Sequence, residues 1–190
     1  MTREFAIAGR MVGKGRPCYV IAEAGVNHNC DPQLGRRLIE TAALSGADAI
    51  KFQSYKAGRI STRIAPRYWF EPSDPQGTQW DTFARLDKLS DADFAALLSH
   101  ARQVGLTAFS TPFDDDAVDF LVALGVPAFK IASADLTCHG LIERCARNGK
   151  PMILSTGTST LAEVEEALDA AIKENGNTET TEHTEETAGS

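Results

Sequence analysis

The sequence predicts an α/β protein built from repeated strand–helix units, with the strands parallel in one sheet. Four glycines, Gly46, Gly105, Gly125 and Gly149, are each followed by a few apolar residues and then by polar ones. Stretches with apolar residues at helical spacing lie between these segments. Parallel strands end at one edge of their sheet, so the polar residues of different units are expected to meet there, as in the active site of a β/α barrel.

The first elements are a short hairpin and the first strand–helix unit. Residues 4–12 are expected to form the hairpin, with Gly9-Arg10 at its turn. Residues 18–24 form the first parallel strand. The helix that follows begins with Asp31 as its N-cap and Pro32 in its first turn, where the missing N–H does no harm.

Four more units follow. Two of their helices begin at capping boxes, Ser90-x-x-Asp93 and Thr160-x-x-Glu163, and the other two are expected near 117–124 and 141–148. Five units in all are fewer than the eight of a closed TIM-type barrel, so the predicted fold is an incomplete barrel. The four further strands are expected at residues 49–53, 107–111, 128–133 and 152–156.

Two segments stand apart from the repeats. Residues 55–89 contain both tryptophans and three prolines, and loops of this length inside a domain are usually lids or binding loops. The alternative is a loop that packs on its own aromatic side chains. Residues 1–175 are expected to form the barrel portion, and residues 176–190, acidic and rich in threonine, to be disordered.

Composition excludes some classes of partner. The net charge is −7, and four glutamates of the last segment supply −4 of it. This charge favours neither nucleic acid nor an anionic membrane as a partner. The four cysteines form no C-x-x-C pair and no apolar run reaches the length of a membrane span, so we expect reduced thiols and a cytoplasmic protein.

Polar residues close each predicted strand and define a candidate site. Two lysines among apolar neighbours need anionic partners, and with a single carboxylate among several hydroxyls the balance is positive. The pattern therefore predicts a pocket for a phosphate or carboxylate group. The strand-end residues are Glu23, Lys51, Gln53, Ser110, Thr111, Lys130, Ser133, Ser155 and Thr156.

Two other interpretations of these residues stay open. Glu23 and a lysine could form a buried ion pair that only fills the barrel. Alternatively, Lys51 or Lys130 could form a Schiff base with a carbonyl substrate, as in a class I aldolase. The residues alone do not decide among the anion pocket, the structural ion pair and the Schiff-base lysine.

Five motifs in order resemble the sialic acid synthase (N-acetylneuraminate synthase) family, whose relatives make legionaminic and pseudaminic acids. The similarity runs from about residue 4 to 175 and is specific because the motifs recur at barrel spacing. The motifs are IAEAGVNHN at 21–29, GADAIKFQ at 46–53, FSTPFD at 109–114, FKIAS at 129–133 and ILSTG at 153–157.

The resemblance implies a condensation of phosphoenolpyruvate with N-acetylmannosamine or a related sugar, assisted by a divalent metal, Mn²⁺ or Mg²⁺. It implies that Glu23 binds the sugar and transfers protons near its aldehyde, with Gln53 beside it. The residues implied to hold the phosphate and carboxylate of phosphoenolpyruvate are Lys51, Thr111, Lys130, Ser133 and Ser155.

The chain also departs from the family. In the family, the histidines that bind the metal lie on later strands, which we expect this chain to lack. His28 is expected to form hydrogen bonds rather than bind a metal. We also expect the chain to lack the small antifreeze-like domain, which in the family lends an arginine to the partner subunit's site. We therefore expect a truncated, inactive portion of a homodimeric synthase, or a non-catalytic chain that pairs its open strand edges with another chain. Cys30 stands where the family usually has Gly, and Asp135 stands where the family usually has Glu.

Overall fold

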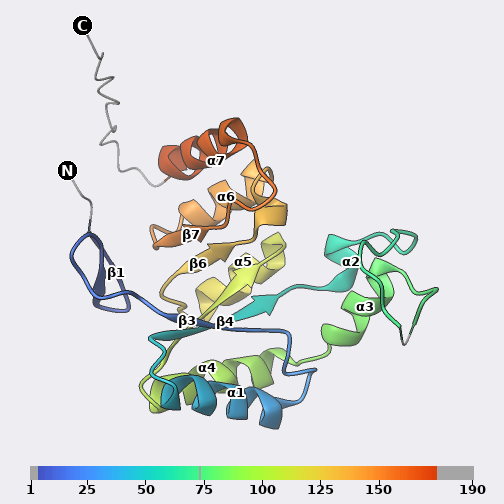
Figure 1. Cartoon of the computed structure of the whole chain (residues 1–190), viewed down its shortest axis with the longest axis horizontal. Coiled ribbons are helices and arrows are strands. Elements are labelled where there is room, and N and C mark those ends of the chain that lie inside the picture. The colour runs from blue at the N-terminus through green and yellow to red at the C-terminus, as the bar shows by residue number, and fades with distance from the viewer. Residues whose placement is uncertain (1–3, 73, 175–190) are drawn as a thin grey trace, which may run out of the picture.

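The computed structural model describes residues 4–72 and 74–174, and their arrangement confirms the predicted incomplete α/β barrel (Figure 1). Five parallel strands form one sheet in the order β3-β4-β5-β6-β7, so strands that are neighbours in sequence are neighbours in space. All carboxyl ends therefore lie at one edge. The strands are β3 (Ile21–Gly25), β4 (Ala49–Ser54), β5 (Thr107–Pro112), β6 (Phe129–Ile131) and β7 (Met152–Leu154).

A helix follows each strand or its connecting segment (Figure 1). The predicted N-caps are confirmed: the side chain of Asp31 accepts from the N–H of Gln33, and that of Ser90 from the N–H of Asp93. The helices are α1 (Pro32–Leu44), α4 (Asp91–Gln103), α5 (Asp115–Ala123), α6 (His139–Ala146) and α7 (Leu161–Glu174).

Aromatic residues fill the core between the sheet and the helices. Phe52 and Phe129, on β4 and β6, are fully buried. The ring of Phe94 on α4 packs edge-on against Phe52, with the ring centroids 5.7 Å apart, and it contacts Phe120 on α5 at the same distance. Such pairs add stability beyond the area they bury, and here they join the sheet to two helices.

The N-terminal hairpin of β1 (Phe5–Ile7) and β2 (Arg10–Val12) has a different turn from the one predicted. The turn residues are Ala8 and Gly9, with φ of 50° and 83°, because a two-residue hairpin turn of this twist needs both residues in the left-handed region. Arg10 instead begins β2, and its guanidinium pairs with Asp48. Asp48 also accepts from the N–H of Val20 at 2.7 Å, which fastens the hairpin beside the sheet.

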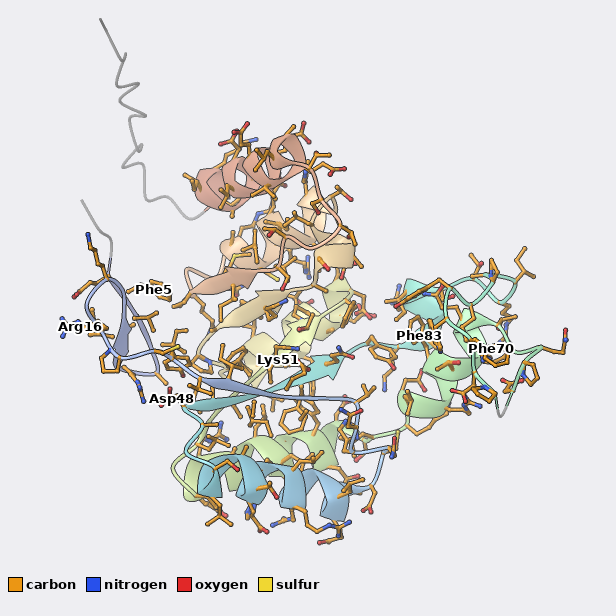
Figure 2. All side chains as sticks on the ribbon, in the orientation of Figure 1. Phe5, Arg16, Asp48, Lys51, Phe70 and Phe83 are labelled. Atoms are coloured by element: carbon orange, nitrogen blue, oxygen red, sulfur yellow. The ribbon has the colours of Figure 1, made fainter. Side chains whose placement is uncertain are left out.

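Residues 55–89, called the arm below, are more ordered than the long loop predicted. They contain two helices, α2 (Ala57–Ile60) and α3 (Gln79–Leu86), and α3 begins with a capping box. An aromatic chain runs outward from Tyr55 through Phe83 and Trp69, with centroid distances of 5.4 Å and 6.2 Å. In Figure 2 Phe83 lies on the side of the arm that faces the rest of the molecule, while Phe70 lies on the outer part of the arm. The arm thus packs on its own aromatic side chains.

The predicted disordered tail, residues 176–190, lies outside the described residues. In the described part of the chain, no helix combines the length and the apolar character needed to cross a bilayer.

The packing of α1 on α4 gives a stability test. Gly35 is buried, and a Cβ there would lie 2.7 Å from Cδ1 of Leu97, which is 1% exposed. We expect Gly35→Ala to lower the free energy of unfolding by about 1–3 kcal/mol through overpacking, although alanine is the better helix former by about 1 kcal/mol.

Urea or thermal unfolding measures this difference, and Gly58→Ala is the matched control. Gly58 is exposed on α2, and an added Cβ meets no atom within 4 Å, so its substitution should leave stability equal or slightly higher. Equal stability of the Gly35→Ala variant and the parent chain would contradict the close packing of the two helices.

Candidate active site

The site begins with an ion pair between adjacent strands. Glu23 and Lys51 are register partners on β3 and β4, and their carboxylate and ammonium groups form a salt bridge. The Lys51 side chain is only 10% exposed, whereas that of Glu23 is 54% exposed. Nζ of Lys51 also lies 3.5 Å from Oγ1 of Thr111 on β5. Three predicted site residues on three strands therefore contact one another (Lys51 is labelled in Figure 2).

The pair is not the buried, space-filling one that the sequence left open. Its carboxylate is more than half exposed, so Glu23 can be approached from solvent while Lys51 stays nearly buried. The arrangement gives the nearly buried ammonium of Lys51 a partner and leaves that partner accessible.

Gln53 lies beside this pair because Gly25 leaves room for it. Gly25 has φ of +52°, and a Cβ there would be 3.2 Å from Oε1 of Glu23 and 3.7 Å from Cδ of Gln53. Glu23 and Gln53 thus flank the same glycine, and a side chain at position 25 would push them apart.

Lys130 is the second cation of the site. Its Nζ donates to the carbonyl oxygen of Ile131 at 2.7 Å. Burial lowers the pKa of Lys130, and the nearby positive charge of Lys51 lowers it further, while Glu23 and Asp135 act in the opposite direction. The two lysines therefore lie near enough for the charge of one to affect the other, and their role in binding an anion stays a prediction.

The two predicted serines lie next to Lys130. The N–H of Ser155 donates at 3.1 Å to the same Ile131 carbonyl that Lys130 binds. Oγ of Ser133 lies 3.7 Å from the position that a Cβ on Gly157 would take. The structure thus brings these residues to the same edge as Lys51, and their roles in binding stay predictions.

Ser110, a further strand-end residue, does not join the site. Its side chain is fully buried, and its Oγ lies 2.8 Å from Oγ of Ser54. Side chains alternate between the two faces of a strand, so Ser110 lies on the opposite face from Thr111.

Asp135, noted from the sequence only as a replacement for the family's usual Glu, was not among the predicted binding residues but lies near Lys130. It ends a short 3₁₀ helix, Ser133–Asp135, directly after β6. Its Oδ2 is buried and has no hydrogen-bond partner among the described residues. Burial raises the pKa of Asp135, against the lowering effect of Lys130. The edge therefore carries two carboxylates and two ammonium groups, and the predicted positive balance is wrong.

His28 is a hydrogen-bonding residue, as predicted. It is 2% exposed, its Nδ1 accepts from the N–H of Cys30 at 3.0 Å, and burial lowers its pKa. Cys30 has φ of +61°, a region that favours the glycine usual in the family. Among the residues that the structure describes, no group of three or more His, Cys, Asp or Glu side chains is placed to hold a metal ion, so they do not fit the expected divalent metal.

Comparison with known proteins gives the family context of this geometry. The sequence profile of the NeuB family matches residues 38–184. An N,N'-diacetyllegionaminic acid synthase of Legionella pneumophila is 38% identical over 167 residues, which cover 87% of this chain and 47% of that protein. The enzyme of the same name from Campylobacter jejuni is 43% identical over 157 residues, covering 81% and 46%. The chain thus spans about half the length of the curated relatives it matches.

A solved structure agrees with the sequence matches. The N-acetylneuraminic acid synthetase of Leptospira borgpetersenii, determined in complex with citrate, superposes with a TM-score of 0.77 at 30% identity, covering 92% of this chain and 56% of that one. The resemblance drawn from the five motifs is confirmed by profile, relatives and structure together. The chain belongs to the NeuB family.

Proposed function

We propose that the edge formed by β3 to β7 binds phosphoenolpyruvate. As part of a complete synthase it would condense this substrate with an N-acetylated amino sugar, giving a nonulosonic acid and phosphate. The observation that carries the proposal is the placement of Lys51 and Lys130 on β4 and β6 of one parallel sheet, with Lys51 paired to Glu23 and Lys130 bound only to a main-chain carbonyl. Two cations and nearby hydroxyls suit a small trianion. The names of the relatives support the sugar class.

The two lysines make different contacts before an anion binds. Lys51 is already paired with Glu23, so its charge is stabilised before a substrate arrives. Lys130 forms no ion pair within the described part of the chain, and its ammonium contacts a main-chain carbonyl. An anionic ligand would supply the counter-charge that Lys130 lacks, with the hydroxyls of Thr111, Ser133 and Ser155 as donors.

In the proposed reaction, the enol carbon of phosphoenolpyruvate attacks the aldehyde carbon of the sugar. The aldehyde oxygen takes a proton, water adds to the cation left at the phosphate-bearing carbon, and loss of phosphate leaves a ketone. Glu23 is the group proposed to move the proton at the aldehyde oxygen, because it is exposed and borders the lysines. Gln53 beside it would orient the sugar.

Other properties follow from the family and form part of the proposal. A complete synthase would use Mn²⁺ or Mg²⁺, act as a homodimer and work in the cytoplasm. The residues that the structure describes do not form a site for this metal.

A Schiff-base aldolase is the second candidate, favoured by the lowered pKa of Lys130. Incubation with pyruvate and borohydride tests it, followed by mass spectrometry of the peptide that carries Lys130. The synthase proposal predicts no covalent adduct, whereas an adduct at Lys130 or Lys51 would favour the aldolase.

Binding of phosphoenolpyruvate to the full chain, measured by calorimetry, tests the anion site. We expect Lys130→Met to weaken binding by roughly 10- to 100-fold, the effect of losing a charged contact worth about 1.5–3 kcal/mol. The control is Lys150→Met, because Nζ of Lys150 also donates to a main-chain carbonyl, that of Val126 at 2.7 Å, but from just before β7. Equal losses for the two variants, or no binding by the parent chain, would contradict the proposal.

The pH dependence of this binding follows from the direction of the Lys130 shift. Since its pKa is lowered, Lys130 loses its proton at a lower pH than an ordinary lysine. The affinity for phosphoenolpyruvate should be highest below the pKa of Lys130 and should fall as the pH rises through that pKa. Lys130→Arg keeps its charge and should bind with less change over the same alkaline range. A parent chain whose affinity fell only where ordinary lysines titrate would count against this role of Lys130.

A further inference from the structure

The outer part of the arm carries three large apolar side chains that are almost fully exposed. Ile64, Tyr68 and Phe70 are between 77% and 87% exposed, and Figure 2 shows Phe70 on the outer part of the arm. Trp69, between the two aromatic residues in sequence, is less exposed and packs on Phe83. Apolar side chains that are exposed together mark an interaction surface, whereas scattered single ones are normal.

Interior contacts of the arm hold this surface in place. The guanidinium of Arg67 is almost buried and pairs with Asp74 at 2.9 Å. The guanidinium of Arg63 lies over the ring of Trp80, 4.1 Å from its centroid, and forms no salt bridge among the described residues. The surface therefore combines apolar side chains with a cation that lacks a counter-charge. The arm tip, as we call this surface, consists of Arg63, Ile64, Tyr68 and Phe70.

Helix α7 also has an apolar face that remains exposed. One side of the helix packs on α6 and buries Ala167, Ala170 and Ala171 (Figure 1). On another side, three large apolar residues follow one another at spacings of seven and four, which places them on one helix face. Their side chains are between 44% and 82% exposed. This face, called the α7 stripe below, consists of Leu161, Leu168 and Ile172.

Negative charge borders the α7 stripe. Within Leu161–Glu174 the sequence has five carboxylates and a single cation, Lys173. Glu165 and Asp169 are exposed and form no salt bridge among the described residues. They are four positions apart, where like charges on a helix repel each other. Two copies of α7 would therefore repel each other, whereas a partner with an apolar surface and a cation is favoured.

We propose that the arm tip of one copy of this chain docks on the α7 stripe of a second copy. The apolar side chains of the two surfaces cover each other, and Arg63 supplies the counter-charge for Glu165 and Asp169. The arm and α7 lie apart in the molecule (Figure 1), so the contact joins two chains.

The proposed contact joins two different surfaces, so copies add head to tail rather than pair about a two-fold axis. It uses side chains of the arm and of a helix, not the open strand edges. It forms whether or not the edge of the sheet binds phosphoenolpyruvate.

Sedimentation velocity of the full chain at increasing protein concentration tests the proposal. We expect the parent chain to associate. An arm variant, Ile64→Ser with Phe70→Ser, and a helix variant, Leu161→Gln with Leu168→Gln, should each associate at least about tenfold more weakly, because each loses apolar contact area. Leu44→Gln is the matched control. Leu44 is 90% exposed at the end of α1 but belongs to neither surface, so this variant should associate like the parent.

Mixing the two double variants distinguishes head-to-tail docking from any other association. The arm variant keeps its α7 stripe and the helix variant keeps its arm tip, so the mixture should form one-to-one dimers that grow no further. Arg63→Glu and Glu165→Lys repeat the test without removing an apolar side chain: each should weaken association alone, and their mixture should restore it.

Three results overturn the inference. The first is a parent chain that stays monomeric at every concentration. The second is association that the arm and helix variants retain at full strength. The third is a mixture of variants that associates no more than either variant alone.

Discussion

The salt bridge between Lys51 and Glu23 is the contact on which the site depends, because it gives a nearly buried ammonium group a counter-charge on the neighbouring strand. Without the carboxylate, an ammonium that is only 10% exposed would be a buried charge without a partner, which is strongly destabilising. Burial lowers the pKa of Lys130, and the positive charge of Lys51 lowers it further. Among the described residues Lys130 forms no salt bridge, and its ammonium contacts a main-chain carbonyl. This is the property that makes the edge receptive to an anion.

Most of the fold could be predicted because the signals are local. Glycines that end helices and side chains that cap them depend on a few adjacent residues, and the caps at Asp31, Ser90 and Thr160 are all present. The arm was harder to predict. Its helix α3 begins with the same capping-box spacing at Thr78 and Asp81, a signal hidden among prolines and aromatics. Helix α2 has no side-chain cap; its first N–H is held by Asp87, thirty positions away, and no local pattern reveals that contact.

The residues of the candidate site likewise fall into those that the sequence predicts and those that it does not. Lys51, Thr111 and Lys130 could be predicted because parallel strands deliver their ends to one edge. Asp135 was noted only through the family resemblance, because the 3₁₀ turn after β6 that carries it back toward Lys130 leaves no local signal in the sequence.

The central claim is that two lysines share a single anion. The most direct measurement is an NMR titration of phosphoenolpyruvate into the chain with isotope-labelled lysine side chains. The account predicts that the Lys51 and Lys130 signals move together with one affinity, while the Lys150 signal stays in place. Movement of only one of the two, or separate affinities for each, would contradict it.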